Sequence, residues 1–229
     1  MRVRRTFAFL DLSGFTALTV TEGDERSVAV LGVFRGALRR ICSRRGVRIA
    51  KWLGDGAMLV GVDTTPVLCT ALEILAAREL AGERVAVKCG ITSGPVILLE
   101  GDDYIGHSVN LAARLCDLAH GGEVLADPAL VAALPPWARA GAPRQVVVRG
   151  VSAPVDVVDL ALHPLTDEAT ADPVCGIHLT DETAVSWRSA GSLGRWLFCS
   201  DSCVDTWESR PGPGQEGPSD EAFVRDGIA

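Results

Sequence analysis

The chain has 229 residues, 48% of them hydrophobic and 22% charged, so it can fold as a soluble globular protein with a sizeable core. Its formal net charge is −7 and no basic stripe runs along it, which argues against a general nucleic-acid binder. No apolar run reaches the roughly 18 residues of a membrane-spanning helix, so we expect no membrane span.

The N-terminal stretch MRVRRTFAFLDL has the basic start and apolar run of a secretion signal. However, Asp11 interrupts the run and no small-residue cleavage site follows it. The cysteine count of seven is odd, and Cys42, Cys69, Cys89 and Cys116 have apolar neighbours, as small buried side chains do. We therefore expect a cytoplasmic protein.

Strand and helix patterns fill the chain up to about residue 163. Apolar runs over residues 4–12, 47–53 and 56–62 predict strands, the last two joined by the turn Gly54-Asp55-Gly56. Apolar residues at i, i+3 and i+4 predict helices over 24–46 and 66–82, each closed by a glycine. Further strands are predicted over 84–92, 94–100, 122–127, 144–150 and 154–160. These elements predict an α+β domain with a mostly antiparallel sheet and helices on one face.

A helix entry stands at DDYIGHSVNLAARL, residues 102–115. Asn110 and Arg114 are four residues apart and share one helix face, and Asp103 lies on the loop that leads in. Taken alone, the pattern also fits an asparagine bonded locally near a helix start and an arginine along a solvated surface.

Two aspartates interrupt or follow apolar strands. Asp11 closes the strand TFAFLDL, and Asp55 lies at the tip of the hairpin KWLGDGAML. Locally, Asp55 fits a turn former and Asp11 a strand terminator. If the two strands are neighbours, however, both carboxylates converge at one edge, which is what Mg²⁺ requires when substrate phosphates supply its other oxygen ligands.

The last quarter of the chain has a different character. Residues 164–171 are rich in Thr and acidic residues and predict a linker, and Cys175, Cys199 and Cys203 follow. We expect a main domain over 1–163, a small domain over 172–210 and a flexible tail over 211–229.

Four stretches together resemble the class III nucleotide cyclases. FLDLSGFT (9–16), KWLGDG (51–56), GITSGPV (90–96) and DYIGHSVNLAARL (103–115) occur in the family's order and approximate spacing, and VRGVSAPVDVVDL resembles its closing strands. The likeness covers nearly all of residues 5–162. It implies a ferredoxin-like cyclase catalytic domain.

The resemblance also implies roles for individual residues. Asp11 and Asp55 match the pair that binds two Mg²⁺ or Mn²⁺ ions in this family. Lys51 and Asp103 match the pair that contacts the purine. Asn110 and Arg114 match the residues that position the ribose and stabilise the reacting phosphate. Arg149 stands at the position that contacts the terminal phosphates. At this last position the family commonly has a lysine.

The implied activity is conversion of ATP to 3′,5′-cyclic AMP and pyrophosphate. Lys51 and Asp103 offer the donor and acceptor that complement adenine, whereas guanine presents the reverse pattern, so we expect ATP rather than GTP. In the family, metal aspartates come from one chain and the other contacts from its partner. This chain has both halves, which predicts a homodimer with two sites.

A second resemblance lies in the C-terminal segment. Asp172–Ile177 reads DPVCGI and Phe198–Cys203 reads FCSDSC, similar to the ends of YHS and TRASH-like metal-binding domains. Three thiolates suit Cu(I) or Zn²⁺, and a domain of about 40 residues benefits from such a cross-link. His178 is a candidate extra ligand. Alternatively, the cysteines only pack in a small core.

Two classes of function follow from the sequence. One is an adenylate cyclase modulated by a C-terminal metal-binding domain. The other is a catalytically weak nucleotide-binding module coupled to a metal sensor, and a guanylate cyclase is a further alternative. The presence of all six principal cyclase residues favours the enzyme.

Overall fold

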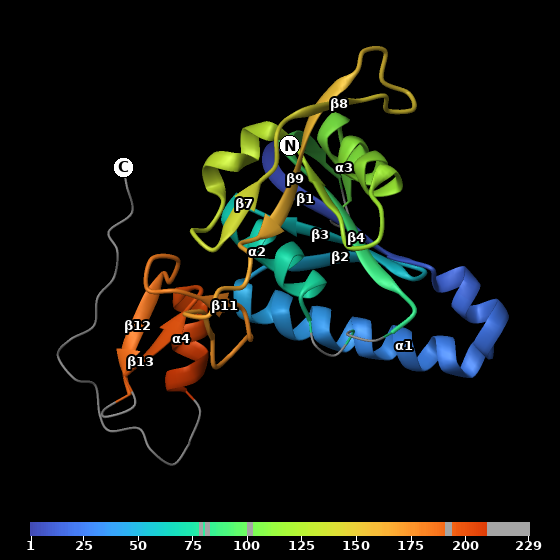
Figure 1. The fold of residues 1–229 in the computed structure, drawn as a ribbon. Helices are drawn as coiled ribbons and strands as arrows, with labels where there is room; N and C mark the ends of the chain where they lie inside the picture. Colours follow the sequence, from blue (N-terminus) through green and yellow to red (C-terminus); the bar gives the residue numbers. More distant parts are fainter. Residues whose placement is uncertain (78–79, 81–82, 100–102, 191–193, 210–229) are drawn as a thin grey trace. The chain divides into compact units, whose positions relative to one another are not determined.

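The structure is a computed structural model that describes residues 1–77, 80, 83–99, 103–190 and 194–209 (Figure 1). The chain forms two compact units. One comprises Met1–Leu134 with Ala140–Ala161, and the other comprises Pro135–Arg139 with the described residues from Leu162 onward. The tail predicted over 211–229 lies outside the described residues.

The first unit is built around one sheet. Its elements in chain order are β1 (Arg2–Ser13), α1 (Phe15–Arg45), β2 (Arg48–Leu53), β3 (Gly56–Gly61), α2 (Thr64–Leu75), β4 (Ala86–Leu98), β5 (Tyr104–Ile105), α3 (His107–Leu118), β6 (Val124–Ala126), the 3-10 helix η3 (Pro128–Ala133), β8 (Arg144–Val146) and β9 (Val155–Leu162). The strand order is β2-β3-β1-β4-β6-β9, with β5 on β4 and β8 on β9.

The mostly antiparallel α+β fold is confirmed. β6 runs parallel to β4, whereas the pairs β2–β3, β1–β3, β1–β4, β4–β5, β6–β9 and β8–β9 are antiparallel. The strands predicted over 84–92 and 94–100 are one strand, β4. Its ladder with β1 continues through Gly94 and Pro95, which the sequence pattern had suggested as a break.

Three helix boundaries differ from those predicted, among them the start of α2 at Thr64 rather than residue 66. α1 begins at Phe15 rather than residue 24, because two helical stretches join across Gly23, whose φ is 84°. α1 ends at Arg45 and is closed, as predicted, by Gly46 in the left-handed conformation that glycine adopts readily. α2 ends at Leu75, short of the predicted residue 82.

The expectation that the helices share one face is wrong. Thr6 Oγ1 of β1 lies 2.9 Å from Thr64 Oγ1 of α2. The next residue, Phe7, packs with Val109 and Ala112 of α3. Successive strand residues point to opposite faces, so α2 and α3 cover opposite sides of the sheet (Figure 1).

Close packing of α3 on the sheet fixes the position of this helix. Gly90 of β4 lies so near the backbone of Ala112 and Cys116 that a Cβ there would collide with both. Leu115 and Ala112 are fully buried beside it. The opposite face of α3 therefore presents Asn110 and Arg114 to solvent.

The second unit contains β10 (Thr170–Ala171), β11 (His178–Leu179), β12 (Ser186–Ser189), β13 (Arg195–Phe198) and α4 (Asp201–Glu208). β10 pairs with β11, and β12 pairs with β13. Trp137, just before β7 (Ala138–Ala140), is 1% exposed, and its Nε1–H donates to the Cys199 carbonyl over 2.9 Å. This contact explains why Pro135–Arg139 belongs to this unit.

None of the described helices combines the length and apolar character needed to cross a membrane.

Candidate active site and cysteine cluster

Two carboxylates converge where β1 meets the β2–β3 turn. β1 and β3 are antiparallel with Leu10 opposite Ala57, which places Asp11 beside Gly56 and the turn residue Asp55. A Cβ on Gly56 would collide with the Leu10 carbonyl and lie 3.3 Å from Asp11 Oδ1, so this approach requires glycine. Burial raises the pKa of Asp55, and the negative charge of Asp11 raises it further. Two adjacent carboxylates of this kind fit a hard divalent cation such as Mg²⁺ or Mn²⁺.

Lys88 is a neighbour of this pair that the sequence analysis missed. It stands opposite Asp11 in the β1–β4 ladder, and its Nζ lies 3.2 Å from Asp11 Oδ2. Its side chain is 18% exposed, and its positive charge lowers the pKa of Asp55. Aligning the two strand sequences in register would have found this cross-strand pair.

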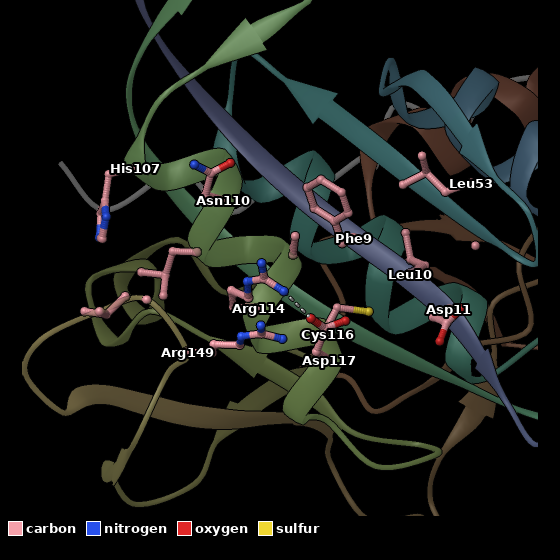
Figure 2. Close-up of a pocket in the computed structure, with 15 residues that line it drawn as sticks. Phe9, Leu10, Asp11, Leu53, His107, Asn110, Arg114, Cys116, Asp117 and Arg149 are labelled. Atoms are coloured by element: carbon pink, nitrogen blue, oxygen red, sulfur yellow. Dashed lines mark hydrogen bonds and ion pairs between the residues drawn. The ribbon is translucent and has the colours of Figure 1, made fainter.

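A hollow of about 660 Å³ joins the Asp11 end of β1 to the exposed face of α3. Four predicted site residues line it: Asp11, Asn110, Arg114 and Arg149. Figure 2 shows Asn110 and Arg114 projecting from α3, with Arg149 on the same side as Arg114 and Asp11 on β1. The hollow therefore has a carboxylate on one wall and an amide and two guanidinium groups on another.

Among the residues that the structure describes, Arg114 makes one weak side-chain contact. Its Nη1 lies 3.1 Å from Asp117 Oδ2 one helical turn away, and the two side chains are 48% and 66% exposed. An ion pair this exposed contributes about 0 to 1 kcal/mol. A phosphate group can therefore displace Asp117 at little cost.

Lys51 and Asp103 meet each other but do not line this hollow. Lys51 Nζ of β2 donates to Asp103 Oδ1 over 2.8 Å, and both side chains are nearly half exposed. The hydrogen bond from Lys51 lowers the pKa of Asp103, as does the Tyr104 backbone N–H. The two residues predicted to contact the purine thus form one donor–acceptor pair at the surface.

The three C-terminal cysteines also come together. Cys199 Sγ lies 3.4 Å from Cys175 Sγ and 3.6 Å from Cys203 Sγ. Asp172 completes a group whose four candidate ligand atoms lie within 4.8 Å of one another. Its carboxylate was not predicted as part of the site, although it opens the DPVCGI stretch. His178 is exposed and is not a member of this group.

The cysteine cluster is largely buried, and Cys175 is its partly exposed member. Asp172, Cys199 and Cys203 are 2%, 1% and 0% exposed. Burial raises the pKa of Asp172, and the nearby Cys199 raises it further, whereas three backbone N–H groups lower it. Hydrogen bonding with Cys199 and Cys203, together with burial, raises the pKa of Cys175.

Comparison with models of protein families finds no match. Among curated proteins, an uncharacterized protein of Mycobacterium tuberculosis is 33% identical over 162 residues, which are 70% of this chain and 42% of that protein. A pH-sensitive adenylate cyclase of M. tuberculosis is 34% identical over 123 residues, 52% of this chain and 30% of the relative. The chain thus spans less than half the length of these relatives.

Solved structures show the same fold. The adenylyl cyclase CyaB from P. aeruginosa has a TM-score of 0.63 and 23% identity, with 72% of this chain and 96% of that chain covered. The guanylyl cyclase Cya2 has a TM-score of 0.63 and 22% identity, with 73% and 96% covered. With a mixed sheet, α3 and the two converging aspartates in place, the chain has the fold of a class III nucleotide cyclase catalytic domain.

Proposed function

We propose that this protein is an adenylate cyclase that converts ATP to 3′,5′-cyclic AMP and pyrophosphate. The observation that carries the proposal is the hollow lined by Asp11, Asn110, Arg114 and Arg149. Curated relatives named adenylate cyclases, about 30% identical over about half of this chain, support the same reaction.

The reaction forms a bond between the ribose 3′-oxygen and the α-phosphorus and breaks the bond from that phosphorus to the β-phosphate oxygen. The 3′-hydroxyl loses its proton, and pyrophosphate leaves with the bonding electrons. The protein's contribution to such a transfer is positioning and neutralisation of phosphoryl charge.

Asp11 and Asp55 would hold two Mg²⁺ or Mn²⁺ ions, which when bound supply Lewis acidity to the hydroxyl and the phosphates. Lys88, which pairs with Asp11, would add a positive charge beside the metal-binding carboxylates. Arg114 offers a planar fork of donors for phosphoryl oxygens, and Asn110 orients the ribose one turn away. Arg149 neutralises the terminal phosphates.

We propose ATP as the preferred nucleotide, because Lys51 and Asp103 provide one hydrogen-bond donor and one acceptor at adjacent positions for the adenine edge. The mutual contact of the two side chains supports a shared binding surface for one purine edge. Neither residue lines the hollow. We also propose a homodimer in which each site takes Asp11 and Asp55 from one chain and Lys51, Asp103, Asn110 and Arg114 from its partner, so that the hollow of one chain contributes one end to each of two sites.

The test is incubation of purified protein with ATP or GTP and with Mg²⁺ or Mn²⁺, followed by mass-resolved detection of cyclic nucleotide. Cyclic AMP at a higher rate than cyclic GMP is the expected result. Predominant cyclic GMP would favour a guanylate cyclase. Nucleotide binding without turnover would instead favour the weak binding module.

A second function is favoured by the cysteine cluster. We propose that residues 172–210 form a YHS/TRASH-like domain in which Cys175, Cys199 and Cys203 bind one thiophilic metal ion, Cu(I) or Zn²⁺, that modulates the cyclase. The two short sulfur–sulfur distances support binding. Metal analysis of the reduced protein, with cyclase assays before and after metal removal, tests binding and modulation separately.

A further inference from the structure

The buried group around Cys199 contains a carboxylate as well as three thiols. Asp172 is 2% exposed, and its carboxylate accepts from the backbone N–H groups of Val174, Cys175 and Cys199 at 2.8, 3.2 and 2.8 Å. Across the described part of the chain, no lysine, arginine or histidine pairs with it. An ionised carboxylate buried this deeply is costly, and a cation bound beside it would offset that cost in addition to the three backbone donors.

Two sulfur–sulfur separations in this group are close to those around one small tetrahedral ion. A Zn²⁺ ion with metal–sulfur bonds of about 2.3 Å places neighbouring sulfurs about 3.8 Å apart. The two observed sulfur–sulfur separations are 3.4 and 3.6 Å, and all four atoms lie within 4.8 Å. Side-chain shifts that bring the four atoms to these spacings would complete a closed coordination shell.

Asp172 has a lone pair left for a metal. An ionised carboxylate offers about four acceptor sites, and three backbone donors occupy three of them, two on Oδ1 and one on Oδ2. The remaining site is on Oδ2, the oxygen that also accepts from Cys199 N.

The same hydrogen bonds fix the turns that carry the cysteines. The backbone N–H of Asp172 donates to the Ile177 carbonyl, and its carbonyl accepts from the Gly176 N–H, which closes this turn. Gly176 adopts a φ of 76° directly after Cys175. The bond to Cys199 N then joins this turn to the residue after β13. Asp172 therefore holds two separate parts of the chain around one point.

We propose that Asp172 is the fourth ligand of this site and that its oxygen selects a borderline divalent ion, Zn²⁺, over Cu(I). The proposal rests on the metal-binding function proposed above for the three cysteines. Thiolates alone accept both ions, but a hard carboxylate oxygen and a four-coordinate tetrahedral shell suit Zn²⁺, whereas soft Cu(I) prefers sulfur. On binding, the thiols release their protons to solvent.

The experiment uses the full-length reduced protein with Zn²⁺ or Cu(I) alone as the probe. Zinc X-ray absorption of the wild type should show three sulfur ligands at about 2.3 Å and one oxygen at about 2.0 Å. In Asp172→Cys the shell should become four sulfurs. A shell that keeps three sulfurs and one light atom in this variant would overturn the assignment of Asp172.

Affinities measured against chelators provide a second arm. Asp172→Asn should weaken Zn²⁺ binding by at least about 10-fold and change Cu(I) binding far less. The matched control, His178→Asn, alters an exposed side chain beside the site and should leave both affinities unchanged. Equal affinities for Zn²⁺ in Asp172→Asn and the wild type would overturn the proposal, as would equal losses for the two ions in a folded variant.

A different result is expected if the three cysteines do not bind metal at all. If reduced wild type holds no stoichiometric Zn²⁺ or Cu(I), and Cys175→Ser/Cys199→Ser/Cys203→Ser behaves identically, then the cysteine site itself is wrong. Loss of the Asp172 effect with intact, cysteine-dependent binding rejects only the fourth ligand and the ion preference.

Discussion

The two candidate metal sites of this chain differ in how complete they are. Asp11 belongs to a hollow of about 660 Å³, and its side chain is 37% exposed. Asp172, by contrast, is 2% exposed among three cysteines and is fixed by three backbone donors. Catalytic metal sites keep coordination positions open for substrate, whereas structural sites are closed. The difference supports chemistry at the first site and a structural or sensing role at the second.

The largest expected effect is at the open site. Asp11→Asn or Asp55→Asn should reduce cyclic AMP formation by at least about 1,000-fold, because each removes a metal-binding oxygen that the reaction needs. Asp156→Asn, which alters an exposed carboxylate of β9, is the matched control and should keep normal turnover. Normal rates in a folded Asp11→Asn protein would contradict the metal assignment.

If each active site is shared between two chains, two inactive variants should complement each other when mixed. Equal amounts of inactive Asp55→Ala and Arg114→Ala chains should recover about a quarter of wild-type activity, because random pairing makes half the dimers mixed and each mixed dimer has one intact site. Asp55→Ala mixed with Asp11→Ala is the control and should recover nothing, since both lesions fall in the same half of the site. If mixed dimers form and the first pair stays inactive, the shared site is wrong.

The purine pair should respond to reversal of its polarity. Lys51→Glu with Asp103→Cys should lower kcat/KM for ATP by about 10- to 100-fold and raise it for GTP, since the donor and acceptor change places. Lys51→Met with Asp103→Ala should lower ATP use without any gain for GTP. Undiminished preference for ATP in the reversed variant would mean that other residues recognise the base.

The cysteine cluster should instead be sensitive to the packing of the residues around it. Trp137→Phe keeps an aromatic ring but removes the donor to the Cys199 carbonyl, and it should lower the free energy of unfolding of the second unit by about 1 to 3 kcal/mol. Trp196→Phe is the matched control, because Trp196 is 39% exposed. Denaturant unfolding followed by circular dichroism makes the measurement, and equal midpoints for the two variants would contradict the role of Trp137.

Sequence patterns predicted most strands, α3 and the convergence of Asp11 and Asp55. Helix periodicity, however, does not tell which face of a sheet a helix covers, so the opposite placement of α2 and α3 required the three-dimensional contacts. Contacts between distant segments were also missed. Trp137 lies 62 residues before Cys199, and no local pattern links the two.

The roles assigned to the site residues stay predictions. The structure adds two residues that the sequence analysis did not assign to either site. Lys88 was overlooked because a lysine in an apolar strand reads as a surface residue until the β1–β4 register puts it opposite Asp11. Asp172 was read as part of a motif rather than as a ligand, because its carboxylate meets the other cysteines through a contact with Cys199, 27 residues later.

The smallest expected effect tests whether a single exposed partner sets the charge of Asp103. The Lys51 hydrogen bond lowers the pKa of Asp103 below the ordinary 3.8, so the contact stabilises the folded protein above that pH and is lost as the pH falls through the lowered value. Lys51→Met should therefore raise the pKa of Asp103 toward 3.8, leaving only the Tyr104 N–H to lower it. Carboxyl carbon NMR across the acid range measures this directly.

Lys88→Met, which removes a cation paired with Asp11 instead, should leave the Asp103 titration unchanged. An Asp103 pKa that does not move in Lys51→Met would mean that the two side chains are apart in solution, and the proposed purine surface would then have to form only when nucleotide binds.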